Sequence, residues 1–398
     1  MKKGKTIVSL FILVIMLFLA ACSNDTTAPT SSVENEGKET NEDAEIVYIG
    51  YSGPLSGPAA YYGENTLSGL QLAEEEINKE GFEVNGKKYN IQIVSLDDKY
   101  MPNEAAANAK RLVQENKTPI IYNPHSGGIA AMQVFNEQDQ FIVAAYSSEP
   151  DITQVGNSLT VRIPPTYDGY IEPFTKYAME RFGPKIASLP TATQYGKDWS
   201  EALLPYWESK GGEVVYNTAI DFSKETDFFT ILTNALKDDP DVLFIGGASE
   251  PTAKLAIQAR ELGFEGGFIV MDQAKLDEMK AISGSYETFE GAIGTMPLIF
   301  SDYPGTKPFI DSYQAKFNKD PGSEAGFHYL SLFIFVEAMK AAGSVDDAKL
   351  IHEHMQDGID SLPEDKKVYV VEEIDENGGF NLATQYGAIE DGAVAPVE

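Results

Sequence analysis

Residues 46–77 read IVYIGYSGPLSGPAAYYGENTLSGLQLAEEEI, and this stretch contains the unit from which most of the chain is built. It opens with an apolar, β-rich run at 46–51 and continues through a loop rich in glycine and proline. Leu67, Leu70, Ala73 and Ile77 follow at spacings of three and four residues, which places them on one face of a helix. A strand, a loop and a helix in this order indicate the start of a parallel α/β sheet.

The same alternation continues along the chain. Further strands are predicted at 90–96, 119–122, 141–145, 159–163, 185–189, 213–220, 241–245 and 267–271, with helical patterns in between. Strand–helix alternation over this length predicts parallel sheets with helices on both faces. Pro164 and Pro165 end the strand at 159–163 and indicate a crossover between two α/β blocks. The last third differs: we expect helices at 305–318, 324–342 and 346–356, then a strand at 367–372.

Composition and motifs narrow the class of protein. The 398 residues include 30 Lys plus Arg and 61 Asp plus Glu, a formal net charge of −31. This charge speaks against a nucleic-acid partner, because phosphates require a basic face. One cysteine excludes a disulfide or a multi-cysteine metal site within the chain. Common nucleophile, phosphate-loop, dinucleotide and zinc-protease motifs are missing, so we expect no enzyme activity, no cofactor and no metal.

The N-terminus carries an export signature. Lysines at 2, 3 and 5 precede an apolar run that ends at Leu19-Ala20-Ala21-Cys22, and we predict a signal peptide at 1–21. Small residues before a cysteine resemble the lipobox of bacterial lipoproteins, which implies that Cys22 carries the lipid. The alternative is an ordinary signal, or an uncleaved anchor, with a chance cysteine. Residues 22–45 are polar and acidic, so they are predicted to form a flexible tether.

The residues that follow the predicted strands suggest a site, because ligands of open parallel sheets bind at the carboxyl ends of the strands. The candidates are Tyr62, Ser126, Tyr146, Ser148, Tyr195 and Asp272. The only basic residues noted near these edges are Lys99 and Lys197, so an anionic group must be held by hydroxyls, backbone N–H groups and a helix N-terminus.

Each candidate has a structural alternative. Ser126 either binds a carboxylate or simply caps the helix that follows it. Ser148 is either a second carboxylate donor or a turn residue. Tyr62 and Tyr195 are either walls of a pocket or packing residues. Asp272 either receives a ligand ammonium or caps the next helix.

At this point the sequence resembles a known family. Residues 46–77 are similar to the opening of bacterial branched-chain amino-acid binding proteins, the type I solute-binding proteins of ABC transporters. The similarity continues through nearly all of 46–398, and includes IQIVSLDDKYMPNEAAANAKRLV at 91–113, SGGIAAM at 126–132, Gln194-Tyr195-Gly196 and DVLFIGGASEPTAKLAIQARELGF at 241–264.

The resemblance implies two Rossmann-like lobes with parallel sheets, joined by a three-segment hinge and closing on a ligand. Lobe 1 would comprise 46–163 and 297–380, and lobe 2 would comprise 164–296 and 381–398. In the family pattern, a serine at the position of Ser126 and a hydroxyl residue at the position of Ser148 hold the ligand's α-carboxylate, and Tyr146 offers its backbone. Tyr62 and Tyr195 fall on tyrosines of the pattern. Asp272 falls where the family more often has a glutamate that receives the ammonium, and Ala248 replaces an aromatic residue.

The expected function is therefore that of an extracytoplasmic, lipid-anchored receptor on the cell membrane. It would bind a small solute, an amino acid or a related compound, and deliver it to an ABC permease and ATPase complex. One alternative is a sensory ligand-binding protein of the same fold. Another is a binder of an amide, a urea-like solute or an aromatic acid.

The lipid anchor can be tested directly. Because Cys22 is the only thiol in the chain, Cys22→Ala should abolish lipid labelling and leave an unprocessed precursor. Metabolic labelling with a radioactive fatty acid and a gel-shift assay measure both effects. Normal labelling of the variant would contradict the assignment.

Overall fold

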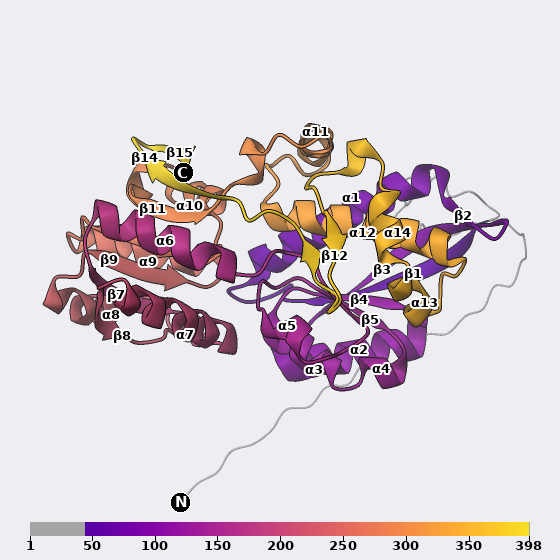
Figure 1. Cartoon of the computed structure of the whole chain (residues 1–398), viewed down its shortest axis with the longest axis horizontal. Coiled ribbons are helices and arrows are strands. Elements are labelled where there is room, and N and C mark those ends of the chain that lie inside the picture. The colour runs from indigo at the N-terminus through magenta and orange to yellow at the C-terminus, as the bar shows by residue number, and fades with distance from the viewer. Residues whose placement is uncertain (1–43, 398) are drawn as a thin grey trace, which may run out of the picture. The chain divides into compact units, whose positions relative to one another are not determined.

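The computed structural model describes residues 44–397 (Figure 1). The predicted signal peptide, Cys22 and the tether up to residue 43 lie outside these residues. Within 44–397, no helix is long and apolar enough to cross a membrane.

The first half of the described chain forms a six-stranded sheet with the order β2-β3-β1-β4-β5-β6. All neighbouring pairs are parallel except β2 and β3, which form a hairpin around Asn85-Gly86. The strands are β1 (Glu45–Gly53), β2 (Phe82–Val84), β3 (Lys87–Asp97), β4 (Ile120–Asn123), β5 (Ile142–Ala145) and β6 (Thr160–Arg162). The connecting helices are α1 (Ala60–Glu80), α2 (Pro102–Asn116), α3 (Ser126–Gln133), α4 (Asn136–Asp139) and α5 (Asp151–Gln154).

Both faces of this sheet are buried, as expected for parallel strands. On β4, Ile120 and Tyr122 point into a core shared with α1, whereas Ile121 points into a second core with α2 and α3. Side chains alternate between the faces of a strand, so the continuous apolar runs in the sequence supply two cores at once. We call this sheet and the helices packed on it lobe 1.

A later segment returns to lobe 1. It contains α11 (Thr306–Phe317), α12 (Ser323–Ala342), α13 (Ala348–Glu353), α14 (Met355–Asp360) and the small hairpin β12 (Glu373–Ile374) and β13 (Phe380–Asn381). Helix α12 is buried on nearly all sides and packs beside α1 over the sheet (Figure 1). A helix that is apolar all round must lie inside the protein.

Lobe 2 is built on a seven-stranded sheet with the order β15-β14-β11-β10-β9-β7-β8. Its strands are β7 (Lys185–Pro190), β8 (Glu213–Asn217), β9 (Val242–Gly246), β10 (Gly267–Val270), β11 (Ala292–Thr295), β14 (Tyr386–Glu390) and β15 (Ala393–Pro396). Its helices are α6 (Asp168–Arg181), α7 (Gln194–Ser209), α8 (Phe229–Ala235), α9 (Ser249–Glu261) and α10 (Leu276–Ser283). The core with α6 and α7 lies on one face, and the core with α8, α9 and α10 lies on the other.

The chain passes between the two sheets three times: after β6, after β11 and after β13. Short 3-10 turns complete the connections, at η1 (Leu236–Asp238), η2 (Glu287–Phe289), η3 (Leu298–Phe300) and η4 (Glu364–Lys366). The predicted class, two α/β lobes joined by three segments, is therefore confirmed.

Several details differ from the sequence-based expectation. The sheet of lobe 2 is not wholly parallel, because β14 and β15 add an antiparallel edge beside β11. The helix expected at 346–356 is broken at His354, where α13 ends and α14 begins. The strand expected at 367–372 does not form, and β12 begins only at Glu373. These segments are short and irregular, so their periodicity carried little information.

Candidate functional site

The ends of the strands of both lobes meet at one small cavity. It is lined by Tyr62, Tyr100, Pro124, His125, Ser126, Tyr146, Ser147, Ser148, Pro164, Tyr195, Asp272, Gln273 and Lys275. All six residues singled out from the sequence are among them. They come from the start of α1, from the ends of β4 and β5, from the start of α7 and from the end of β10. Parallel strands explain this convergence, because their carboxyl ends lie at the same edge of a sheet.

The cavity is nearly filled by its own walls. Its volume is about 30 Å³, enough for about two water molecules. Tyr62, Tyr146, Ser148, Tyr195 and Asp272 are all buried. The described structure therefore has the two lobes closed, and a solute of amino-acid size requires them to move or the walls to rearrange.

On the lobe 1 side, His125 and not Ser126 caps α3. The Nδ1 atom of His125 accepts a hydrogen bond from the backbone N–H of Gly128 at 3.0 Å. Its Nε2 atom lies 3.0 Å from a carboxylate oxygen of Asp98 and must donate to it, since Nδ1 is the acceptor. The capping alternative for Ser126 is wrong, and its hydroxyl makes no hydrogen bond to any described residue. Tyr62 is fixed by donating its hydroxyl to the carbonyl oxygen of Pro124 at 2.8 Å.

On the lobe 2 side, Asp272 is held by aromatic donors. Its carboxylate accepts hydrogen bonds from the Tyr195 hydroxyl and from Trp199 Nε1, the latter at 3.0 Å. Burial and the Asp272 carboxylate raise the pKa of Tyr195 well above its ordinary value, so this hydroxyl keeps its proton and donates it. Ser148 then donates to the same hydroxyl oxygen at 2.7 Å, which links the two lobes. Helix α10 begins four residues further on, at Leu276, with Lys275 as its N-cap, so Asp272 does not cap it.

A second hollow lies outside this cavity. It has a volume of about 420 Å³ and is lined by residues of both lobes, among them Lys99, Met101, Thr193, Phe222 and Ala248. Tyr100 and Gln273 line both spaces and join the lobes through a 2.7 Å hydrogen bond between Gln273 Nε2 and the Tyr100 hydroxyl. The ring of Tyr100 stacks on His125 at 4.6 Å between centroids. This contact separates the outer hollow from the inner cavity.

Seven lining residues are not among the six candidates from the sequence: Tyr100, Pro124, His125, Ser147, Pro164, Gln273 and Lys275. Tyr100 lies in a left-handed turn after β3, with φ 64°, which no apolar periodicity reveals. His125 directly precedes Ser126, and the sequence alone does not show which of the two caps the following helix. Lys275 follows Asp272 by three residues, so its position in the sequence does indicate a further basic residue near these strand ends.

Comparison with known proteins identifies the family. The family model described as periplasmic binding protein matches residues 46–370.

The chain belongs to the periplasmic binding protein family.

Relatives and solved structures agree with this assignment. The Leu/Ile/Val-binding protein of Escherichia coli K12 is 27% identical over 280 residues, 70% of this chain and 74% of the relative. A Pseudomonas aeruginosa protein named for binding leucine, isoleucine, valine, threonine and alanine is 27% identical over 311 residues, 77% and 81% of the two chains. A leucine-binding protein from Thermotoga maritima has the same fold, with a TM-score of 0.75, 24% identity, and 88% and 98% of the two chains covered.

Membership in the periplasmic binding protein family makes this chain an extracytoplasmic solute-binding protein and supports a non-enzymatic role.

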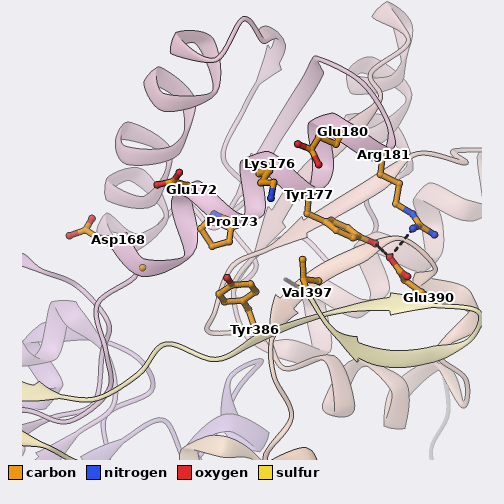
Figure 2. Close-up of a pocket in the computed structure, with 11 residues that line it drawn as sticks. Asp168, Glu172, Pro173, Lys176, Tyr177, Glu180, Arg181, Tyr386, Glu390 and Val397 are labelled. Carbon is orange, nitrogen blue, oxygen red and sulfur yellow. Dashed lines mark hydrogen bonds and ion pairs between the residues drawn. The ribbon is translucent and has the colours of Figure 1, made fainter.

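One hollow of the structure lies away from the candidate site. A larger groove of about 810 Å³ lies between α6 and β14, where Tyr177 and Arg181 both bond to Glu390 (Figure 2). None of the six predicted site residues lines it, and all of its lining residues belong to lobe 2.

A cluster of acids joins the lobes of this binding protein beside the inner cavity. Glu278 of α10 accepts hydrogen bonds from Asn65 of α1 and from Ser249 of α9, both at 2.5 Å. Burial and the neighbouring Glu324 of α12 raise the pKa of Glu278 well above its ordinary value. Burial, followed by Glu324, raises the pKa of Asp277 to about 7. Among residues 44–397, no group of acidic, histidine or cysteine side chains is arranged to hold a metal ion.

These acids predict a pH dependence of stability. In the folded protein Asp277 and Glu278 retain protons that the unfolded chain releases near pH 4, so raising the pH from about 4 to about 7 lowers the free energy of unfolding. Glu278→Gln removes one such group while keeping its hydrogen-bonding shape. We expect the variant to melt about 2 °C or more above wild type at pH 8 and close to wild type at pH 4.5, measured by thermal unfolding.

The control is Glu250→Gln, a partly exposed acid on α9 that pairs with Lys254. It removes the same charge without altering the interface between the lobes. Equal effects of the two substitutions at pH 8 would show that overall charge, and not the buried cluster, causes the change.

Proposed function

We propose that this protein is a lipid-anchored receptor that binds a small amino acid or related solute between its lobes and delivers it to an ABC permease and ATPase complex. The observation that carries the proposal is the inner cavity, where six residues from distant segments of both lobes come together. The named relatives bind branched-chain amino acids, which supports an amino acid as the solute class. The membrane anchor is Cys22, proposed from its lipobox-like context.

The proposed roles follow from the chemistry of each side chain. Ser126 and Ser148 donate hydroxyl hydrogens to the solute carboxylate, with the backbone at Tyr146 and the N-terminus of α3 assisting. Asp272 accepts from the solute ammonium, because a buried cation needs a charged or well-placed acceptor. Tyr62 and Tyr195 form the walls.

Tyr195 also explains how the closed site stays satisfied by protein groups alone. Its hydroxyl bonds to both Ser148 and Asp272, the two groups assigned to opposite ends of the solute. Buried polar groups that lose a partner cost about 1–3 kcal/mol each. A solute that enters must therefore replace these bonds, and its carboxylate and ammonium are suited to do so at Ser148 and Asp272.

Two other functions share this fold. A sensory protein would use the same cavity but dock on a membrane receptor, and the genes beside this one distinguish it from a transport component. An amide, a urea-like solute or an aromatic acid would suit the hydroxyl-rich walls as well, and a solute-binding protein of this fold from Rhodopseudomonas palustris is known in complex with benzoate (TM-score 0.73, 17% identity, 89% and 96% of the chains covered). Native mass spectrometry of freshly purified protein identifies a carried-over solute and separates these classes.

Binding should be accompanied by movement of the lobes. The closed cavity of about 30 Å³ is too small for an amino acid unless the lobes move or the walls rearrange, and we expect the lobes to separate at the hinge. A solute that binds the closed form better shifts the population toward it. Small-angle scattering should show a smaller radius of gyration once the identified solute is saturating. An unchanged curve would contradict hinge closure.

Asp272→Asn tests the ammonium site. Asparagine keeps an oxygen that accepts from Tyr195 and Trp199, so the melting temperature without solute should change little. Removing one partner of a buried charge pair costs about 2–5 kcal/mol, roughly 30-fold to several-thousand-fold in affinity. Ser126→Ala should weaken binding less, because the backbone N–H groups of α3 remain. Calorimetric titration with the identified solute measures both affinities. If Asp272→Asn binds within about threefold of wild type, Asp272 does not bind the solute ammonium.

A further inference from the structure

Lys275 is a buried cation beside the proposed amino-acid site. Its side chain lines the inner cavity, and the residue is only 5% exposed. Its ammonium donates one hydrogen bond, to the backbone carbonyl oxygen of Asp272. Among residues 44–397, no carboxylate oxygen lies within 4 Å of it, although three acids belong to the neighbouring cluster, Asp277, Glu278 and Glu324. An ammonium has three hydrogens to donate and is costly to bury without an anion.

A further compartment opens beside this ammonium. It has a volume of about 30 Å³ and shares Tyr146, Pro164, Asp272 and Lys275 with the inner cavity. The rest of its wall comes largely from the three segments that connect the lobes and from α12: Pro165, Tyr170, Thr295, Met296, Ser323, Phe327, Tyr369, Ala383 and Gln385. We call it the hinge-side compartment.

Two hydroxyls of the hinge-side compartment have no partner. Thr295 Oγ1 and the Tyr369 hydroxyl are buried and form no hydrogen bond with any described residue. Unsatisfied buried hydroxyls are uncommon in folded proteins and call for an explanation. Here they line the same space as a buried ammonium without an ion pair, and all three groups can donate a hydrogen bond to a ligand in that space.

We propose that the hinge-side compartment binds a second anionic group of the solute, which makes an amino acid with a carboxylate side chain the preferred ligand class. The inference rests on the proposed function, in which Ser126, Ser148 and Asp272 take the α-carboxylate and the ammonium. Ser126 and Ser148 line only the inner cavity, whereas Lys275 lines both spaces. A side chain that extends from the inner cavity toward the hinge therefore meets Lys275, Thr295 and Tyr369.

The test is a panel of solutes at pH 7, measured by calorimetric titration and thermal shift. L-Aspartate and L-glutamate are compared with the size-matched amides L-asparagine and L-glutamine, and with L-leucine. Wild type should bind the better acid at least about tenfold more tightly than its amide, because the amide leaves Lys275 without an anion. Preference for an amide or for leucine would overturn the inference while leaving amino-acid binding intact. If none of the five binds, the proposed amino-acid function itself fails, and the inference falls with it.

Variants locate the effect. Lys275→Met keeps the apolar stem and should weaken binding of the acid about thirtyfold or more, with less than threefold change for the amide. Lys197→Met is the matched control, since Lys197 is exposed on α7 and pairs only with Glu201 across one helical turn. Equal weakening of acid and amide by Lys275→Met would mean that Lys275 holds the α-carboxylate, which overturns the inference.

A second variant tests the hinge-side compartment independently, in case Lys275→Met does not fold. Thr295→Val removes one hydroxyl at nearly constant size and should weaken binding of the acid severalfold more than that of the amide. Equal affinities of Thr295→Val and wild type for the acid would exclude the hinge-side compartment.

Discussion

Parallel pairing of strands is the constraint on which the architecture of this protein depends. In a parallel sheet every carboxyl end lies at the same edge, so the loops after β1, β3, β4 and β5 must share one rim of lobe 1, and those after β7, β9 and β10 one rim of lobe 2. The three crossings of the chain keep the two rims opposed. Residues as distant in sequence as Tyr62 and Asp272 therefore line one cavity without any local signal that pairs them.

Closing two polar rims against each other removes water from many donors and acceptors, and each must find a new partner. The cleft meets this requirement with aromatic donors: Tyr195 and Trp199 bond to Asp272, and Tyr100 bonds to Gln273 across the lobes. Such side chains bring a large apolar body with a single polar tip, so they exclude water and satisfy a polar group together. The contacts of the closed lobes occupy Ser148 and Asp272, for which a solute must compete. The closed state without solute therefore has different hydrogen bonds from the closed state with solute.

Much of the fold and part of the site can be predicted from the sequence. Strands buried on both faces read as continuous apolar runs, and their ends point to Ser126, Ser148 and Asp272. The sequence does not show which polar side chain caps a helix or which two polar side chains pair. His125 accepts the hydrogen bond at the start of α3, although Ser126 was equally suited to cap this helix. Two helices, α13 and α14, form where a single helix was expected. The antiparallel edge β14–β15 is specified by contacts with β11, nearly a hundred residues earlier, and no local pattern contains them. Lys275 was not among the candidates, because its burial depends on how the two lobes pack and no sequence pattern contains that packing.

The strongly acidic composition and a cleft that carries a buried cation are compatible, because the two act over different ranges. Charges on the surface are screened beyond roughly 8–10 Å at physiological salt, whereas a buried ammonium acts at contact. The acids nearest to Lys275 weaken this effect less than their number suggests. Burial raises the pKa of both Asp277 and Glu278, so they hold protons that exposed carboxyls would have lost. Where Asp277 and Glu278 keep their protons they do not neutralise Lys275, which lines the same compartment as the unpartnered hydroxyls of Thr295 and Tyr369.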